Sequence, residues 1–266
     1  MYNSTRQRNL FSPTSGEPFK LSRSKIELFI SCPRCFYLDR RLGVGRPSMP
    51  AFTLNNAVDT LFKKEFDIHR AAKSRHPIME KYGVDAIPFE HANMGIWREN
   101  FKGAQYHHRP TNFIITGAID DIWINPGGEL IIVDYKATST ENEISMDSEY
   151  RQAYKRQMEI YQWLFRKSGF KVSDTGYFVY ANGKTDRKAF DKKLEFDVQL
   201  FTHVGTDIWV EPKIIEAHAT LVSDVVPRAK EGCEHCNYRV AAGVALQAKM
   251  PKKPKEEASP KAGTLL

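Results

Sequence analysis

The spacing of apolar side chains along the sequence changes from helical to alternating and back again. Apolar positions from Leu21 to Tyr37 recur at helical spacing, which predicts a helix capped by Ser22 or Ser24 and interrupted at Pro33. The segments NFIITGAIDDIWI and LIIVDYK alternate with a period of two around the turn NPGGE, which predicts a β-hairpin. The remaining pattern predicts helices over about 51–70, 147–167 and 200–219, and strands over about 175–180 and 193–198. This mixture predicts one α/β domain.

The predicted hairpin brings chemically active side chains together. If Ile124 and Leu130 close the turn, antiparallel pairing places Asp120 opposite Asp134. Side chains alternate across a strand, so Lys136 shares their face. Two carboxylates at about 5 Å repel each other unless a cation lies between them. Mg²⁺ or Mn²⁺, which prefer oxygen ligands, would resolve this conflict, and Lys136 would add a fixed positive charge.

A simpler interpretation of the hairpin also fits the spacing. D-x-K is a common tripeptide, and Asp134 and Lys136 could form an ion pair at a sheet edge while Asp120 lies at the surface. Asp121 points to the opposite face of the strand in either case. The spacing of these residues leaves both interpretations open.

Composition and charge narrow the class of protein. Hydrophobic residues make up 41% of the chain and charged residues 27%, which excludes a mostly disordered chain, and no apolar run approaches the length of a membrane helix. The start of the chain has no apolar signal segment, so we expect a cytoplasmic protein with no membrane partner. A net charge of +7 favours a polyanionic partner. We expect a flexible leader over 1–20 and a disordered, Lys- and Pro-rich tail over 242–266.

The four cysteines fall into two pairs of identical spacing, Cys32 with Cys35 and Cys233 with Cys236. Disulfides are disfavoured in the cytosol, whereas two Cys-x-x-Cys pairs can supply four thiolates to a zinc ion or an iron-sulfur cluster. The even pairing by itself favours zinc. Four unrelated core cysteines are the alternative, and His235 is expected to be a neighbour rather than a ligand.

The long context GAIDDIW, turn, LIIVDYKATS closely resembles the PD-(D/E)XK nuclease superfamily, specifically the RecB-type nuclease domain and related CRISPR-adaptation exonucleases. The family's third motif, Q-x-x-x-Y on a helix, matches Gln157 and Tyr161. SKIELFISCPRCFYLDRRLGV resembles its opening helix, so the resemblance covers about 21–241. It implies a restriction-endonuclease-like core, in which helices flank a central mixed β-sheet and a four-cysteine metal clasp joins the N- and C-terminal segments.

The resemblance also implies roles for individual residues. Asp120 and Asp134 would hold Mg²⁺ or Mn²⁺ together with the carbonyl of Tyr135, and Asp59 stands where the family usually has a histidine ligand. The catalytic set would be Asp120, Asp134, Lys136, Gln157 and Tyr161. Cluster-bearing relatives usually carry one cysteine in the first helix and three near the C-terminus, so here Cys35 replaces the last. The resemblance favours a 4Fe-4S cluster on the four cysteines, with zinc as the alternative.

The function implied is that of a Mg²⁺- or Mn²⁺-dependent deoxyribonuclease, an exonuclease of DNA repair, recombination or CRISPR adaptation. Its partners would be single-stranded DNA or duplex ends and a helicase or CRISPR-adaptation protein. Candidate phosphate contacts are Arg40, Arg41, Arg151, Lys155 and Arg156. The competing hypothesis is a catalytically weak or inactive DNA-binding or assembly module, favoured by the replacement of the family's histidine by Asp59.

Overall fold

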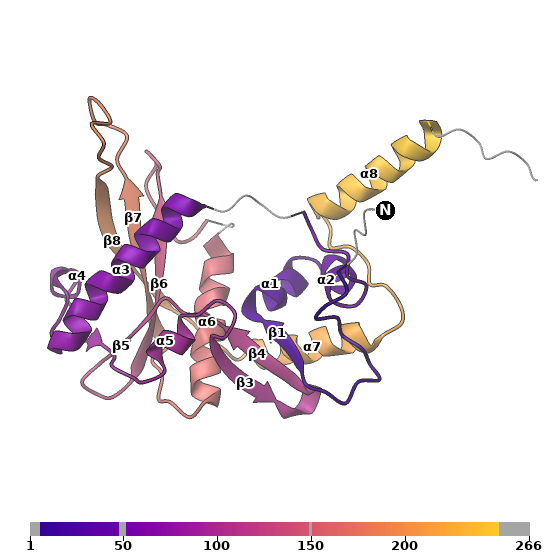
Figure 1. Cartoon of the computed structure of the whole chain (residues 1–266), viewed down its shortest axis with the longest axis horizontal. Coiled ribbons are helices and arrows are strands. Elements are labelled where there is room, and N and C mark those ends of the chain that lie inside the picture. The colour runs from indigo at the N-terminus through magenta and orange to yellow at the C-terminus, as the bar shows by residue number, and fades with distance from the viewer. Residues whose placement is uncertain (1–5, 48–51, 149–150, 250–266) are drawn as a thin grey trace, which may run out of the picture.

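The computed structural model describes residues 6–47, 52–148 and 151–249 (Figure 1). Its strands are β1 (Phe19–Ser22), β2 (Ile87–Pro88), β3 (Ala104–His108), β4 (Phe113–Gly117), β5 (Asp121–Ile124), β6 (Leu130–Thr138), β7 (Thr175–Gly183) and β8 (Phe196–Val204). Its helices are α1 (Arg23–Ser31), α2 (Pro33–Arg40), α3 (Thr53–Ala72), α4 (Pro77–Lys81), α5 (Met94–Trp97), the 3₁₀ helix η1 (Arg109–Thr111), α6 (Gln152–Lys167), α7 (Val210–Val222) and α8 (Glu234–Lys249).

The strands form two sheets, of which the larger carries the hairpin. Its order is β2-β5-β6-β7-β8, with β6 and β7 parallel and the other neighbours antiparallel. The smaller sheet has the order β1-β4-β3. The hairpin pairs Ile124 with Leu130 and Asp121 with Val133, so the predicted register is confirmed. The predicted α/β class, with a central mixed sheet flanked by helices, is confirmed as well.

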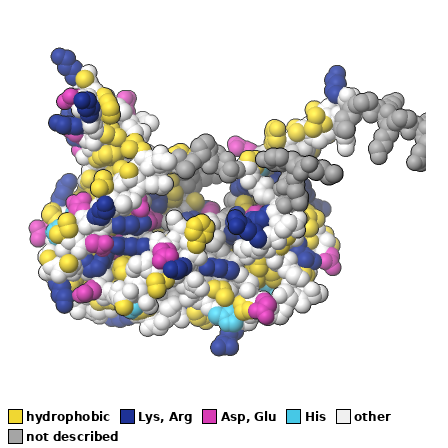
Figure 2. Space-filling model, viewed as in Figure 1, with side chains coloured by type: hydrophobic (Ala, Val, Ile, Leu, Met, Phe, Trp, Pro, Cys, Tyr) yellow, Lys and Arg dark blue, Asp and Glu magenta, His cyan; other side chains and the backbone are white. Residues whose placement is uncertain are grey.

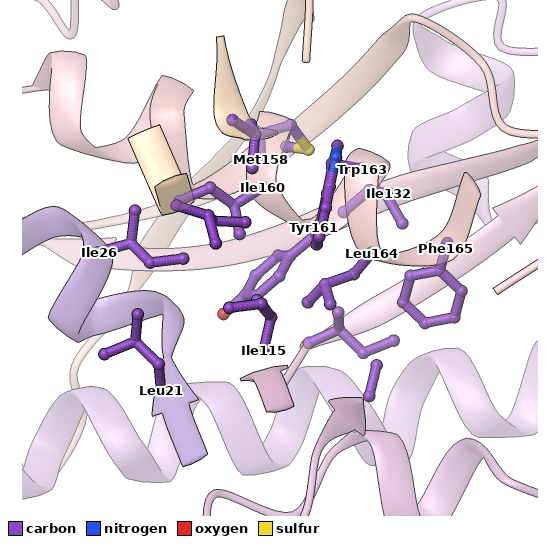
Figure 3. Packing of buried hydrophobic residues seen from close by; sticks show 14 of the residues in the cluster. Leu21, Ile26, Ile115, Ile132, Met158, Ile160, Tyr161, Trp163, Leu164 and Phe165 are labelled. Atoms are coloured by element: carbon purple, nitrogen blue, oxygen red, sulfur yellow. The ribbon is translucent and has the colours of Figure 1, made fainter. Parts of the chain in front are cut away.

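The two faces of the larger sheet are covered by different helices. Ile122 and Ile132 belong to the core that contains the buried side of α6, whereas Trp123 and Val133 pack with Phe66 of α3. This alternation follows from the period-two pattern of both hairpin strands. Figure 3 shows how side chains of α6 lie against Leu21 of β1, Ile26 of α1, Ile115 of β4 and Ile132 of β6. Helix α6 therefore joins the two sheets.

The first hairpin segment differs from the sequence prediction of one strand. NFIITGAIDDIWI divides into β4 and β5, which belong to different sheets. The break follows Gly117, where a Cβ would lie 2.5 Å from the ring of Tyr161. The chain thus passes tightly beneath α6 before β5 begins, and Asp120 lies at the end of this passage.

Two predicted boundaries near the C-terminal half are wrong. Residues 200–204 continue β8 rather than starting a helix, and α7 begins only at Val210. All nine residues of β8 pair with β7, and this pairing overrides the helical spacing seen in the sequence. Helix α6 begins at Gln152, later than the predicted 147.

The chain ends are more ordered than the leader and tail predictions suggest. Phe11 is buried, with its ring 5.4 Å from that of Phe19 and 5.9 Å from that of Phe113. Residues 242–249 belong to helix α8, whereas the sequence analysis predicted a disordered tail there. Residues 1–5 and 250–266 lie outside the described residues. No described helix is long and apolar enough to cross a membrane.

Candidate active site and four-cysteine site

The hairpin and α6 hold the two opposed carboxylates. Asp120 lies just before β5 and accepts a hydrogen bond on Oδ2 from the backbone N–H of Tyr135, at 2.9 Å. Asp134 of β6 is 1% exposed and accepts one on Oδ1 from the Gln157 amide, at 2.7 Å. A neutral donor thus fixes one oxygen of each carboxylate.

The other oxygen of each carboxylate contacts a lysine. Lys136 pairs with Oδ2 of Asp134, and Lys63 of α3 lies 3.3 Å from Oδ1 of Asp120. Burial, opposed by Lys136 and reinforced by Asp120, raises the pKa of Asp134 to about 6. The Lys136 ammonium also lies 4.6 Å from the ring centre of Tyr154. The site therefore balances two close acids with two close cations.

Asp59 comes to the same place from α3. Lys63 Nζ is 2.8 Å from Asp59 Oδ2, one helical turn away, and so bridges Asp59 and Asp120. Burial and the charge of Asp120 raise the pKa of Asp59. Among the described residues, the three aspartates Asp59, Asp120 and Asp134 do not form a group of ligands as close as the cysteines described below, and two lysine ammonium groups lie against them.

Gln157 and Tyr161 both face the site from α6, one turn apart. The Tyr161 hydroxyl donates to the carbonyl of Ala118 at 2.6 Å, and Gln157 Nε2 lies 3.4 Å from that hydroxyl. Burial raises the pKa of Tyr161 to about 12, so it remains a neutral donor. Tyr161 thereby holds the segment that leads into Asp120, while Gln157 touches Asp134 itself.

Around these groups lies a cleft of about 570 Å³. It is lined by side chains of the hairpin, α1, α3 and α6, among them Arg23, Asn55, Asp59, Lys63, Asp120 and Lys136. The space-filling view shows several Lys and Arg side chains on the face between α3 and α1 (Figure 2). A polyanion entering the cleft would meet both basic side chains and the carboxylates of Asp59 and Asp120.

Sequence reasoning missed a charged network on the other face of the hairpin. Asp121 is fully buried and binds Arg70 at 2.5 Å, Arg98 at 3.0 Å and the hydroxyl of Tyr135 at 2.7 Å. Arg98 also donates to the carbonyl of Asp120 at 2.9 Å. The repeated acid in GAIDDIW was the available signal for this network, since an acid on a buried strand face requires partners. No sequence pattern singled out Lys63 or Arg98.

All five basic residues predicted to contact phosphate have partners within the chain. Arg40 is buried and pairs with Asp39 at 2.9 Å, so it is not available as a surface contact. Arg156 holds Glu27 through two bonds of 2.9 and 2.7 Å. The other three candidates also have partners: Arg41 pairs with Asp224, Lys155 with Asp147, and Arg151 donates to the carbonyl of Ser145. The basic residues that line the cleft are instead Arg23, Lys63, Arg98 and Lys136.

The four cysteines converge from the two ends of the domain. Their sulfurs all lie within 4.8 Å of one another, and all four side chains are unpaired thiols. Cys35 Sγ is 3.7 Å from Cys233 Sγ and 3.6 Å from Cys236 Sγ. The predicted meeting of both Cys-x-x-Cys pairs is confirmed, and this cluster can bind a metal.

The chain belongs to the PD-(D/E)XK nuclease superfamily, whose sequence profile matches residues 20–241. Members of this superfamily are generally nucleases that use divalent metals and act on DNA. No curated protein matches the chain. It is similar to the solved structure titled "Crystal structure of SSO0001", with 15% identity, a TM-score of 0.41, and coverage of 85% of this chain and 86% of the other.

Proposed function

We propose that the protein is a deoxyribonuclease that hydrolyses phosphodiester bonds with Mg²⁺ or Mn²⁺. The observation that carries the proposal is that Asp120 and the buried Asp134 lie close enough for their charges to interact, with Lys136 beside Asp134 and with Asp120 and Lys136 lining a cleft that also contains basic residues. Two neighbouring acids, one of them buried, are costly to ionise together without a cation nearby. Membership of a nuclease superfamily supports the same assignment.

The donor set fits a hard divalent ion. Carboxylate oxygens of Asp120 and Asp134 are the ligands that Mg²⁺ and Mn²⁺ prefer. Asp59 is the proposed third acid, and the Tyr135 carbonyl is a further proposed ligand. Lys63 must swing away from Asp120 to expose Oδ1, which its long side chain permits. When bound, the ion would activate a water molecule and neutralise charge on the phosphate.

The protein's own groups would orient this chemistry. Gln157 and the Tyr135 N–H fix one oxygen of each acid. The other oxygens, Asp134 Oδ2 and Asp120 Oδ1, contact Lys136 and Lys63 and would turn to the ion once these ammonium groups move aside. Lys136 would place a positive charge beside the water and the developing negative charge on the phosphate. Tyr161, through the Ala118 carbonyl, would keep Asp120 in register with Asp134.

By its resemblance to RecB-type exonucleases, we further propose cleavage from DNA ends, in concert with a helicase or a CRISPR-adaptation protein. The four free thiols support action in the cytosol, where thiols remain reduced. A second candidate function is a DNA-binding module without catalysis. It is favoured by Lys63, whose ammonium bridges Asp59 and Asp120 where an ion would otherwise lie.

A digestion assay tests these proposals. The full chain is incubated with end-labelled linear duplex, single strands and circular plasmid, each with Mn²⁺, Mg²⁺ or EDTA. We expect degradation of the linear substrates with either metal, loss of activity in EDTA and its return on adding Mn²⁺. Cutting of the circle would contradict action from ends. Tight binding without cleavage of any substrate, in protein shown to bind Mn²⁺, would contradict the nuclease and favour the module.

Asp59 provides a separate prediction. If its carboxylate helps to hold the ion, Asp59→Ala should raise the Mn²⁺ concentration needed for half-maximal activity by about tenfold or more, while activity at saturating Mn²⁺ largely recovers. The measurement is a Mn²⁺ titration of cleavage rate. Asp67→Ala on the same helix is the control, because Asp67 is half exposed and binds Arg70 and Arg98 instead. An unchanged titration for Asp59→Ala would remove this residue from the ion site.

The raised pKa of Asp134 predicts how ion binding depends on pH. A carboxyl with a pKa of about 6 is ionised at about pH 7.5 but mostly protonated one unit below its pKa. Because the ion requires the ionised form, Mn²⁺ affinity should fall about tenfold between roughly pH 7.5 and pH 5. Calorimetric titration at a series of pH values measures this. A constant affinity over the range would show that Asp134 does not take part.

A further inference from the structure

The sulfur geometry distinguishes a single ion from a cluster. Three sulfur–sulfur distances between the two cysteine pairs are 3.8 Å for Cys32 to Cys236, 3.7 Å for Cys35 to Cys233 and 3.6 Å for Cys35 to Cys236. Four sulfurs at about 2.3 Å from one zinc ion, placed at the corners of a tetrahedron, are about 3.8 Å apart. These three separations match edges of this tetrahedron, and none of the six exceeds 4.8 Å.

A 4Fe-4S cluster, which the family resemblance implies, needs four cysteine sulfurs that lie farther apart. Each thiolate binds a different iron at the corner of a cube, so the sulfurs diverge and lie about 6 Å apart. All four sulfurs here lie within 4.8 Å of one another. Every sulfur–sulfur distance would have to increase to admit the cluster, and the burial of the cysteines leaves little room for this change.

The local backbone explains why the arrangement is symmetric. Cys32 caps the N-terminus of α2 and Cys35 lies in its first turn; Cys233 and Cys236 have the same places at the start of α8. Pro33 occupies the first turn of α2, where proline is compatible with a helix, so it does not separate the pair. The N-termini of α2 and α8 therefore meet at the four-cysteine site, and each helix contributes two sulfurs to it. An odd set of one and three cysteines would lack this symmetry.

The surroundings supply charge compensation for four thiolates. The backbone N–H groups of Cys35 and Lys230 hydrogen-bond to Cys32, and the guanidinium of Arg46 lies 3.8 Å from the sulfur of Cys233. Donors of this kind stabilise a thiolate-rich site whose net charge remains negative after a divalent ion binds.

We propose that the four cysteines bind one zinc ion in a tetrahedral site, in place of the iron-sulfur cluster of cluster-bearing relatives. The ion would fasten α8 to the domain. Among the described residues of α8, Cys236 is the one that is buried, and Figure 1 shows the rest of the helix extending away from the body. With so little apolar contact, the bonds to the ion are the main attachment of this helix.

Metal analysis of the full chain tests the proposal. The protein is produced in medium supplemented with both iron and zinc and purified without oxygen, so that either metal can be incorporated. We expect a colourless protein with about one zinc per chain and no acid-labile sulfide. Broad absorption near about 400 nm with about four irons and four sulfides per chain would overturn the proposal. A single iron without sulfide, or no metal at all, would overturn it as well.

Cobalt and single substitutions test the ligand set. Protein grown with Co²⁺ should show the intense visible bands of a tetrahedral thiolate site; bands typical of octahedral cobalt would overturn the geometry. Cys35→Ser and Cys236→Ser should each release most of the zinc, whereas His235→Ala, beside the cluster, should retain it. Should the serine variants fail to fold, release of zinc from the intact protein by a thiol-specific mercurial gives the same answer. Release of about one zinc for four modified thiols is expected, and zinc that survives modification of all four would overturn the assignment.

Discussion

Asp134→Asn and Lys136→Met are each expected to reduce DNA cleavage by about 10²–10³-fold while leaving the fold intact. The first change removes one of the two opposed acids that would bind the ion, and the second removes the positive charge beside the reacting phosphate. Neither should cost much stability. Burial already opposes the ionisation of Asp134, and the Lys136 side chain lines the cleft and is 16% exposed.

The measurements are single-turnover cleavage rates at saturating Mn²⁺, DNA affinity and thermal unfolding. Lys171→Met is the matched control, because Lys171 lies at the other end of β6, where its backbone carbonyl accepts a bond from Leu130 and its side chain is exposed. Control activity should remain at the level of the unaltered chain. If Asp134→Asn or Lys136→Met cleaved DNA at that same rate, the hairpin would have no part in the reaction.

Asp121→Ala is expected to lower the free energy of unfolding by about 3–5 kcal/mol, because it removes the buried one of the two acids that Arg70 and Arg98 share. In a domain of this size such a loss corresponds to a fall in melting temperature of roughly 10 °C. The Tyr135 hydroxyl would lose its acceptor too. The Asp121 side chain points to the opposite face of the hairpin from Asp120 and does not line the cleft. Any loss of cleavage in this variant would therefore follow from the loss of stability.

The exposed acid of the same network provides the comparison. Asp67 binds Arg70 at 3.0 Å and Arg98 at 2.9 Å, but its side chain is 48% exposed. Asp67→Ala should therefore cost about 0–1 kcal/mol, since water replaces an exposed carboxylate. Denaturant unfolding of both variants measures the difference. Equal losses would mean that burial does not set the strength of this network.

Local sequence patterns predicted the parts of the site that depend on neighbouring residues. Alternation around the turn NPGGE determined the hairpin register, and Asp120 and Asp134 directly follow its last pair and lie close enough for their charges to interact. The four-residue spacing of Gln157 and Tyr161 determined that both face one way on α6. The equal spacing of the cysteine pairs indicated a shared metal site, and the sulfurs do converge. In each case, strand or helix geometry alone converts a spacing into a position.

Contacts between distant segments decided the rest. The sequence could not place Lys63 against Asp120, bury Arg40 beside Asp39 or recruit Arg70 to Asp121, because these pairs depend on how helices pack on sheets. Likewise, pairing with β7 made residues 200–204 a strand despite their helical spacing. The sequence by itself determined which acids, amides and thiols share a face. Only the tertiary structure decided which cations meet them and how far apart the sulfurs lie, because burial and separation are properties of the packed chain.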